Sequence, residues 1–196
     1  MASASEVCRG FRVLNMRTET EYVFVDTETT GLDYRTDELL SVSVVDHYGR
    51  CIFHSLVKPE RKKSWNDAER IHGISFEMVR NAPRFKVLKP MLNKLFKGKH
   101  VVAYNMNFDS VFLGSSLRHA ASLHCCMKAY AEYHGEYDPV RQSFKWKKLT
   151  DAVKNCNPDF VFRPHSSLDD SMAAREVWLS LMKHKSIAEK YGFYDK

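Results

Sequence analysis

Four acidic side chains and one histidine, in three segments far apart along the 196-residue chain, are the residues best suited to catalysis. Hard divalent cations take oxygen ligands, commonly a few carboxylates completed by substrate and water. A zinc hydrolase would need more histidine. The acids therefore indicate Mg²⁺ or Mn²⁺ and metal-assisted hydrolysis of a phosphodiester. The five residues are Asp26, Glu28, Asp109, His165 and Asp170.

Asp26 and Glu28 follow an apolar run at residues 22–26, YVFVD, which is typical of a buried strand. Side chains two apart on a strand share a face, so both carboxylates leave the strand's carboxyl end together, where ligands commonly bind in open α/β sheets. Two like charges about 6 to 7 Å apart are unfavourable unless a cation offsets them. The pair predicts a divalent-ion site. An acidic turn after a strand explains the Asp-x-Glu sequence at 26–28 equally well.

Asp109 and Asp170 each lie at the start of a predicted helix, and each also has an explanation without metal. Asp109 falls in the first turn after a strand at 100–105, with Asn107 as the predicted N-cap. The helix dipole favours an acid there by about 0.3 to 1 kcal/mol. The run from Ser167 to Asp170 resembles a capping box.

Helical periodicity favours a further role for Asp170. It shares a stripe with Ala174, Val177 and Leu181, the face expected to pack on the sheet, so its carboxylate should point inward. Asp169 lies about 100° round the helix and is expected in solvent. We therefore exclude Asp169 from the site.

His165 immediately precedes this last helix. A lone histidine is most often structural or simply exposed, and eight others are present in the chain. Beside an acidic metal cluster, however, an imidazole that titrates near neutral pH can take a proton from an attacking water. We predict that His165 is a general base.

The elements that position these residues follow a clear order. Strands at 39–46 and 51–58 flank a turn at Gly49 and form a hairpin beside a central first strand. Strands then alternate with helices, which indicates an α/β domain with a mixed sheet. The remaining predicted strands span 100–105 and 123–127, and the predicted helices span 84–97, 107–119, 128–134, 145–155 and 167–183, after a short helix ending near 72–73.

Charge and composition suggest an anionic partner in a reducing compartment. The formal net charge is +6, with basic clusters at 58–63, 86–99, 145–148 and 183–185, which suits nucleic acid but also describes ordinary solvated faces. Five cysteines without a CxxC motif favour an intracellular site, cytoplasmic or nucleoid/nuclear, over secretion. The chain has no apolar run long enough to span a membrane, so no membrane partner is expected.

A single domain is expected, because the chain length suits one core and no linker-like segment interrupts it. We predict a flexible leader at 1–20, a catalytic domain at 21–185 and a short tail at 186–196.

Three segments resemble the three motifs of the DEDDh family of 3′-5′ exonucleases. This family includes the proofreading subunit of bacterial DNA polymerase III, exonucleases of the Trex type and RNase T. The similar segments are DTETTGL at 26–32, NMNFDSVFL at 105–113 and His165 followed five residues later by Asp170, with HGI at 72–74 between them. The second motif departs from the family at Tyr104, where histidine is frequent, and Ser166 and Ser167 stand where alanine is usual after the histidine.

The resemblance implies a ribonuclease H-like three-layer fold, with a five-stranded mixed central sheet flanked by helices. It also implies that the four acids hold two Mg²⁺ or Mn²⁺ ions and that His165 is the base. By the same resemblance, five further residues contact the terminal nucleotide, with Leu32 as a wedge against its base. These residues are Thr29, Thr30, Leu32, His72 and Phe108.

The expected activity is 3′-5′ exonuclease cleavage of single-stranded or frayed DNA ends, releasing 5′-mononucleotides in proofreading or repair. The expected partners are a nucleic acid with a free 3′ end and a polymerase or another protein. One alternative keeps the chemistry but acts on short or structured RNA, as RNase T and oligoribonuclease do. Another is a non-catalytic nucleic-acid-binding or polymerase-associated subunit of the same fold.

Overall fold

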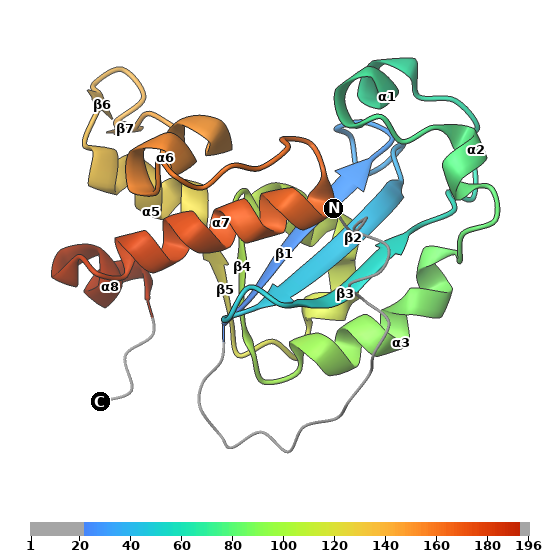
Figure 1. Cartoon of the computed structure of the whole chain (residues 1–196), viewed down its shortest axis with the longest axis horizontal. Helices are drawn as coiled ribbons and strands as arrows, with labels where there is room; N and C mark the ends of the chain where they lie inside the picture. Colours follow the sequence, from blue (N-terminus) through green and yellow to red (C-terminus); the bar gives the residue numbers. More distant parts are fainter. Residues whose placement is uncertain (1–21, 193–196) are drawn as a thin grey trace.

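The computed structural model describes residues 22–192 and contains a five-stranded mixed sheet in the order β3-β2-β1-β4-β5 (Figure 1). Strand β1 is central, antiparallel to β2 and parallel to β4, while β5 extends the parallel side. The predicted central first strand and adjoining hairpin are therefore confirmed. The strands are β1 (Tyr22–Thr29), β2 (Leu39–Asp46), β3 (Cys51–Leu56), β4 (His100–Ala103) and β5 (Ser122–Cys125).

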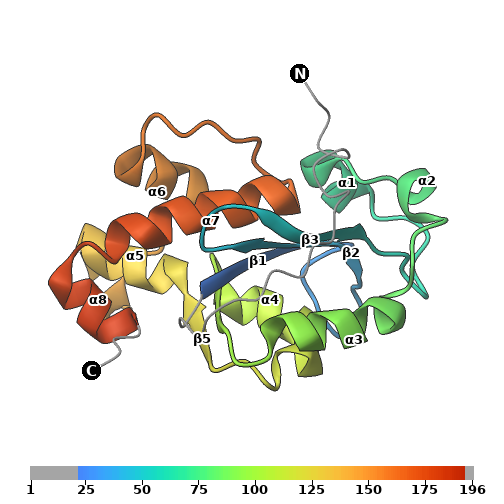
Figure 2. The same cartoon turned by 60° about the horizontal axis from the view of Figure 1, so that its bottom comes forward.

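Helices cover both faces of this sheet and give three layers (Figure 2). Helices α5, α6 and α7 pack on one face, and α3 and α4 pack on the other. The helices are α1 (Asn66–His72), α2 (Phe76–Val79), α3 (Phe85–Phe96), α4 (Met106–Leu113), α5 (Cys126–His134), α6 (Leu149–Cys156), α7 (Ser167–Leu181) and α8 (Lys185–Tyr191), with a 3₁₀ helix, η1 (Gly114–Leu117), after α4.

The alternation of β1 divides the core between these two faces. Phe24 packs in the cluster formed with α5 and α7, where Trp178 is fully buried. Val23 and Val25 point the other way, into the cluster formed with α3 and α4. Because successive strand side chains alternate, Asp26 and Glu28 continue the Phe24 face, and Thr27 continues the opposite one.

The start of α7 is fixed to the sheet by a buried serine cluster, Ser41, Ser43 and Ser167. The Ser167 hydroxyl lies 2.7 Å from the hydroxyl oxygens of both Ser41 and Ser43 on β2. Farther along α7, Ala174, Val177 and Leu181 are buried, as the predicted stripe requires. Ser167, which replaces the alanine usual in the resemblance, therefore locates the helix that carries Asp170.

The structure differs from the sequence expectations mainly around α4 and in the segment before α6. Helix α4 starts at Met106 after Asn105, so Asn107 is not its N-cap, and it ends at Leu113 because Gly114 adopts a positive φ of 53°. Helix α6 begins at Leu149, after a hairpin that was not predicted, β6 (Tyr137–Asp138) with β7 (Ser143–Phe144). Part of the expected tail forms α8, and the expected leader lies outside the described residues.

None of the helices within residues 22–192 has the length and apolar character needed to cross a membrane.

Replacing Ser167 with alanine should lower the free energy of unfolding by about 1 to 3 kcal/mol, because two buried hydroxyls on β2 lose their shared partner. Urea denaturation measures this loss. Ser186, an exposed serine of α8, provides the control, and Ser186→Ala should leave stability nearly unchanged. Equal stability of the two variants would show that the serine cluster does not anchor α7.

Candidate metal centre

Three carboxylates from two elements converge at the carboxyl end of β1. Asp26 and Glu28 come from the strand, and Asp170 comes from the first turn of α7. One ligand oxygen from each lies within 4.8 Å of the others. Such a group of oxygen ligands fits a hard divalent cation. Asp169, which was excluded from the site, instead lies 3.8 Å from the guanidinium of Arg163.

Asp109 reaches this cluster from the other side of the sheet. It is buried in α4, and its Oδ1 accepts a 2.8 Å hydrogen bond from the hydroxyl of Thr27. Thr27 lies between Asp26 and Glu28 on β1, but its side chain faces α4. The three-residue segment 26–28 therefore contributes two carboxylates on the α7 face and a hydrogen bond to Asp109 on the α4 face. We did not single out Thr27 from the sequence, although strand alternation already placed it on the face opposite the two acids.

Burial raises the pKa of all four carboxyl groups. The pKa of Glu28 rises to about 8, those of Asp109 and Asp170 rise to about 7, and that of Asp26 lies well above its ordinary value. Repulsion from neighbouring carboxylates adds to the increase at Asp26, Glu28 and Asp109. The protein by itself therefore disfavours the charged cluster, and a bound cation reverses this preference.

The hydrogen bonding of the Asp170 carboxylate indicates whether a cation fits beside Asp26 and Glu28. Its Oδ2 accepts the backbone N–H of His165 at 3.0 Å, whereas Oδ1 is buried without a hydrogen-bond partner. A buried acceptor of this kind carries a substantial desolvation cost. A divalent ion held by Asp26, Glu28 and Asp170 would give this oxygen a partner, so the residues present fit the expected metal.

His165 lies at the edge of the cluster in an unusual backbone conformation. Its φ is 64°, in the left-handed region, and its side chain is exposed. The N–H bond to Asp170 therefore fixes its backbone while leaving the imidazole free to meet a substrate. His72 is close enough to His165 for repulsion to lower its own pKa, after the larger lowering caused by burial.

His72 also holds Thr29, the last residue of β1, at the start of the loop that follows this strand. Its Nδ1 accepts the N–H of Ile74 at 3.0 Å, which leaves the proton on Nε2 to donate to the Thr29 carbonyl at 3.2 Å. The Thr29 hydroxyl donates to the Gly31 carbonyl at 2.6 Å. Thr29 and His72, both expected at the terminal nucleotide, thus contact each other directly.

Contacts with Asp37 hold Thr30 and Gly31 in the loop after β1. The Thr30 hydroxyl donates to Asp37 Oδ1 at 2.9 Å, and Lys62 forms an ion pair with the same carboxylate. Gly31 is required because a Cβ there would lie 2.5 Å from Asp37 Oδ2. These contacts leave Leu32, 85% exposed, at the tip of the loop.

Phe108, the remaining substrate-binding residue expected from the resemblance, precedes Asp109 on α4. It is half-buried, and its ring centroid lies 5.1 Å from that of Phe112. The nucleotide contacts expected of Thr29, Thr30, Leu32, His72 and Phe108 stay predictions. The sequence did not indicate Asp37 or Lys62, whose role depends on contacts between separate loops.

Comparison with known proteins identifies similar chains over most of the domain. A family model described as Exonuclease matches residues 23–178. An uncharacterized exonuclease, CP81, of Escherichia phage 186 is 32% identical over 165 residues, which are 78% of this chain and 83% of that protein. The DNA polymerase III subunit epsilon of Treponema pallidum is 32% identical over 166 residues, which are 81% of this chain and 75% of that subunit.

Two further matches are one segment of a much longer polymerase and one solved structure of similar size. A DNA polymerase III of PolC type from Thermotoga maritima is 29% identical over 84% of this chain, but the match spans only 12% of that polymerase. The structure of exonuclease X in complex with 5′ overhanging duplex DNA superposes with a TM-score of 0.65 at 22% identity, over 84% of this chain and 93% of that one. The expected ribonuclease H-like fold is confirmed.

The metal-free protein should lose stability as the pH rises from 5 to 8. An acid whose pKa is raised in the folded state takes up protons on folding, so its contribution to stability is lost between its unfolded pKa, near 4, and its folded pKa of about 7 to 8. The melting temperature in EDTA should fall by at least about 3 °C across this range. Mg²⁺ or Mn²⁺ should raise it more at pH 8 than at pH 5.

Glu28→Gln provides the control for this experiment. Removing one buried acid should flatten the pH dependence in EDTA and raise the melting temperature at pH 8. A melting temperature in EDTA that is constant between pH 5 and 8, or identical pH dependence in wild type and variant, would contradict the electrostatic account of the cluster.

Proposed function

Because the chain belongs to the exonuclease family and is a 3′-5′ exonuclease, we propose that it shortens single-stranded or frayed DNA 3′ ends by a two-metal mechanism, releasing 5′-mononucleotides. The observation that carries this proposal is the convergence of Asp26, Glu28 and Asp170 within 4.8 Å. The family is divalent-metal dependent, and the unpartnered oxygen of Asp170 supports a cation at this point.

The four carboxylates would hold the ions from both faces of the sheet. Asp26, Glu28 and Asp170 supply the α7 side, and Asp109, oriented by Thr27, supplies the α4 side. When bound, two divalent ions activate the attacking water and neutralise charge on the phosphate and the leaving oxygen. All four ligands are oxygens, which suits Mg²⁺ or Mn²⁺.

His165 accepts the proton of the attacking water through its exposed imidazole. Asp170 would contribute both to metal binding and to the placement of His165, because its Oδ1 is buried without a hydrogen-bond partner and its Oδ2 fixes the His165 backbone. The loop that follows β1 would receive the terminal nucleotide, with Leu32 against its base and His72 holding Thr29 beneath it. Phe108 on α4 would contact the same terminal nucleotide, and these residues together would form the terminal-nucleotide pocket.

DNA is the proposed substrate because the relatives include a DNA polymerase III subunit. The net charge of +6 favours a polyanion, which DNA and RNA both are. The same relative supports association with a polymerase as part of the proposal. Hydrolysis of matched DNA and RNA strands with free 3′ ends separates this proposal from the exoribonuclease alternative.

Asp26→Ala should abolish Mg²⁺-dependent shortening of a 5′-labelled single-stranded oligonucleotide, because it removes the carboxylate that interacts with all three of the other acids. Gel analysis of the products also reports polarity. Asp169→Ala is the matched control, since it removes an acid adjacent to Asp170 that pairs with Arg163 outside the cluster. Its activity should stay within about twofold of wild type. Full activity of Asp26→Ala would contradict the metal assignment, and an inactive wild type would favour the non-catalytic alternative.

His165→Asn should reduce turnover by about 10²- to 10⁴-fold while leaving oligonucleotide and Mn²⁺ affinity nearly unchanged. Asparagine is preferred to alanine because it tolerates the left-handed backbone of residue 165. Turnover is measured at saturating substrate, and affinity by fluorescence anisotropy in Ca²⁺. A parallel loss of binding and turnover would indicate that His165 has a structural role.

A further inference from the structure

The β6–β7 hairpin places an exposed aromatic side chain that the proposed mechanism does not use. Trp146, two residues after β7, is 61% exposed, whereas Trp65 and Trp178 are 5% and 0% exposed. Exposed aromatic rings beside positive charge are what proteins that bind single-stranded nucleic acid use to stack bases. Segment 136–148 also carries four cationic side chains against two carboxylates.

The hairpin has a well-defined internal structure. Tyr137 pairs with Phe144 across the strands, and their ring centroids lie 5.5 Å apart in an edge-on arrangement. Glu136 binds both Lys145, at 2.7 Å, and Lys147. Trp146 is therefore presented between two fixed residues.

Tyr104 connects this hairpin to the metal centre. Its hydroxyl donates to the Lys147 carbonyl at 2.8 Å, and its own carbonyl accepts the Met127 N–H at 2.9 Å. Phe24 pairs with Val102 in the parallel register, so two residues farther on Tyr104 is level with Asp26. The residue that replaces the histidine usual in the resemblance thus ties Trp146 to the end of the sheet that carries the carboxylates.

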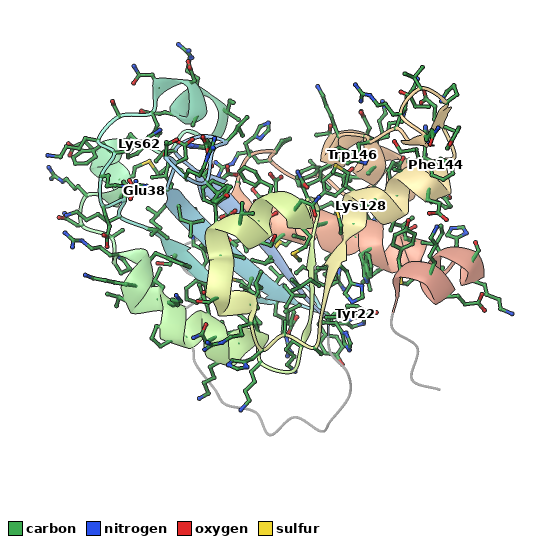
Figure 3. The ribbon with its side chains drawn as sticks, turned by 180° about the vertical axis from the view of Figure 1, so that it is seen from behind. Tyr22, Glu38, Lys62, Lys128, Phe144 and Trp146 are labelled. Atoms are coloured by element: carbon green, nitrogen blue, oxygen red, sulfur yellow. The ribbon has the colours of Figure 1, made fainter. Side chains whose placement is uncertain are left out.

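Two further cationic side chains lie near the segment that carries Trp146. Lys128, next to Met127 in the first turn of α5, and Lys148, at the N-cap of α6, are both exposed, and β7 packs on α5. Figure 3 shows Lys128, Phe144 and Trp146 across the upper end of the molecule from Glu38 and Lys62, which belong to the contacts that hold the loop after β1. Because Tyr104 is level with Asp26, a strand bound at the metal centre could be contacted from this segment as well as from the loop after β1.

We propose that Trp146 is a stacking platform for an unpaired base of the substrate strand, with Lys128 and Lys148 contacting its phosphates. This inference rests on the proposed exonuclease function and extends it to the nucleotides beyond the terminal one. Stacking on an aromatic ring contributes about 1 to 3 kcal/mol per base and is largely independent of sequence. The charge around the ring favours a nucleic-acid strand over an apolar protein surface.

The exposure of a single tryptophan allows the contact to be measured directly. Binding of an eight-residue oligothymidylate in Ca²⁺, with the strand verified as intact, should quench tryptophan emission and protect it from acrylamide. The change should be absent in Trp146→Phe, because Trp65 and Trp178 are buried. Quenching that persists in this variant would overturn the proposal.

Oligonucleotide affinity should depend on the aromatic ring at position 146. Trp146→Ala should weaken oligothymidylate binding by about 5- to 150-fold. Trp146→Phe should retain most of the affinity, and Val140→Ala, a control at a 91% exposed position of the hairpin, should retain all of it. Tyr104→Phe should give a smaller loss than Trp146→Ala, since it frees the hairpin without removing the ring.

Hydrolysis of the p-nitrophenyl ester of thymidine 5′-phosphate distinguishes this inference from the function on which it rests. Its single base requires only the terminal-nucleotide pocket, so Trp146→Ala should leave its turnover unchanged. Failure of wild type to hydrolyse the ester in Mg²⁺ would count against the proposed function. Normal ester hydrolysis with unchanged oligonucleotide affinity in Trp146→Ala would instead overturn the stacking role and indicate that the hairpin contacts a protein.

Discussion

Burial of four mutually repelling carboxylates at one point is the constraint on which this structure depends. Two carboxylates come from one strand and the others from helices on opposite faces, so the sheet and both helical layers must meet at one point. Each carboxyl group has a raised pKa because its neighbours and its burial oppose ionisation. Apolar packing elsewhere must compensate for this cost, and the two large core clusters on either side of β1 supply that packing.

Specific polar contacts hold the ligands where apolar packing alone gives little positional accuracy. The serine cluster fixes the start of α7, Thr27 orients Asp109, and the N–H of His165 orients Asp170. The first two contacts join segments that are remote in sequence, whereas the third is local and joins the residue before α7 to its first turn. Two of the four carboxylates, Asp109 and Asp170, are therefore positioned directly by hydrogen bonds.

The parts of the fold with strong periodic patterns could be predicted from the sequence. The apolar run of β1, the hairpin at Gly49 and the inward stripe of α7 rest on local alternation, and with them the placement of Asp26, Glu28 and Asp170. The β6–β7 hairpin could not be predicted, because two-residue strands carry no periodic signal. The partnership of Ser43 with Ser167 spans 124 residues, and only the assembled fold reveals it.

The buried carboxylate cluster also bears on how this sequence can change over evolutionary time. Replacing one of these acids with its amide relieves repulsion in the metal-free fold, so such changes carry little cost in stability and can even increase it. A lineage released from selection for catalysis would therefore lose these acids readily, while its apolar core remained constrained. An intact cluster in a folded chain of this kind is what selection for the proposed metal-dependent activity would maintain.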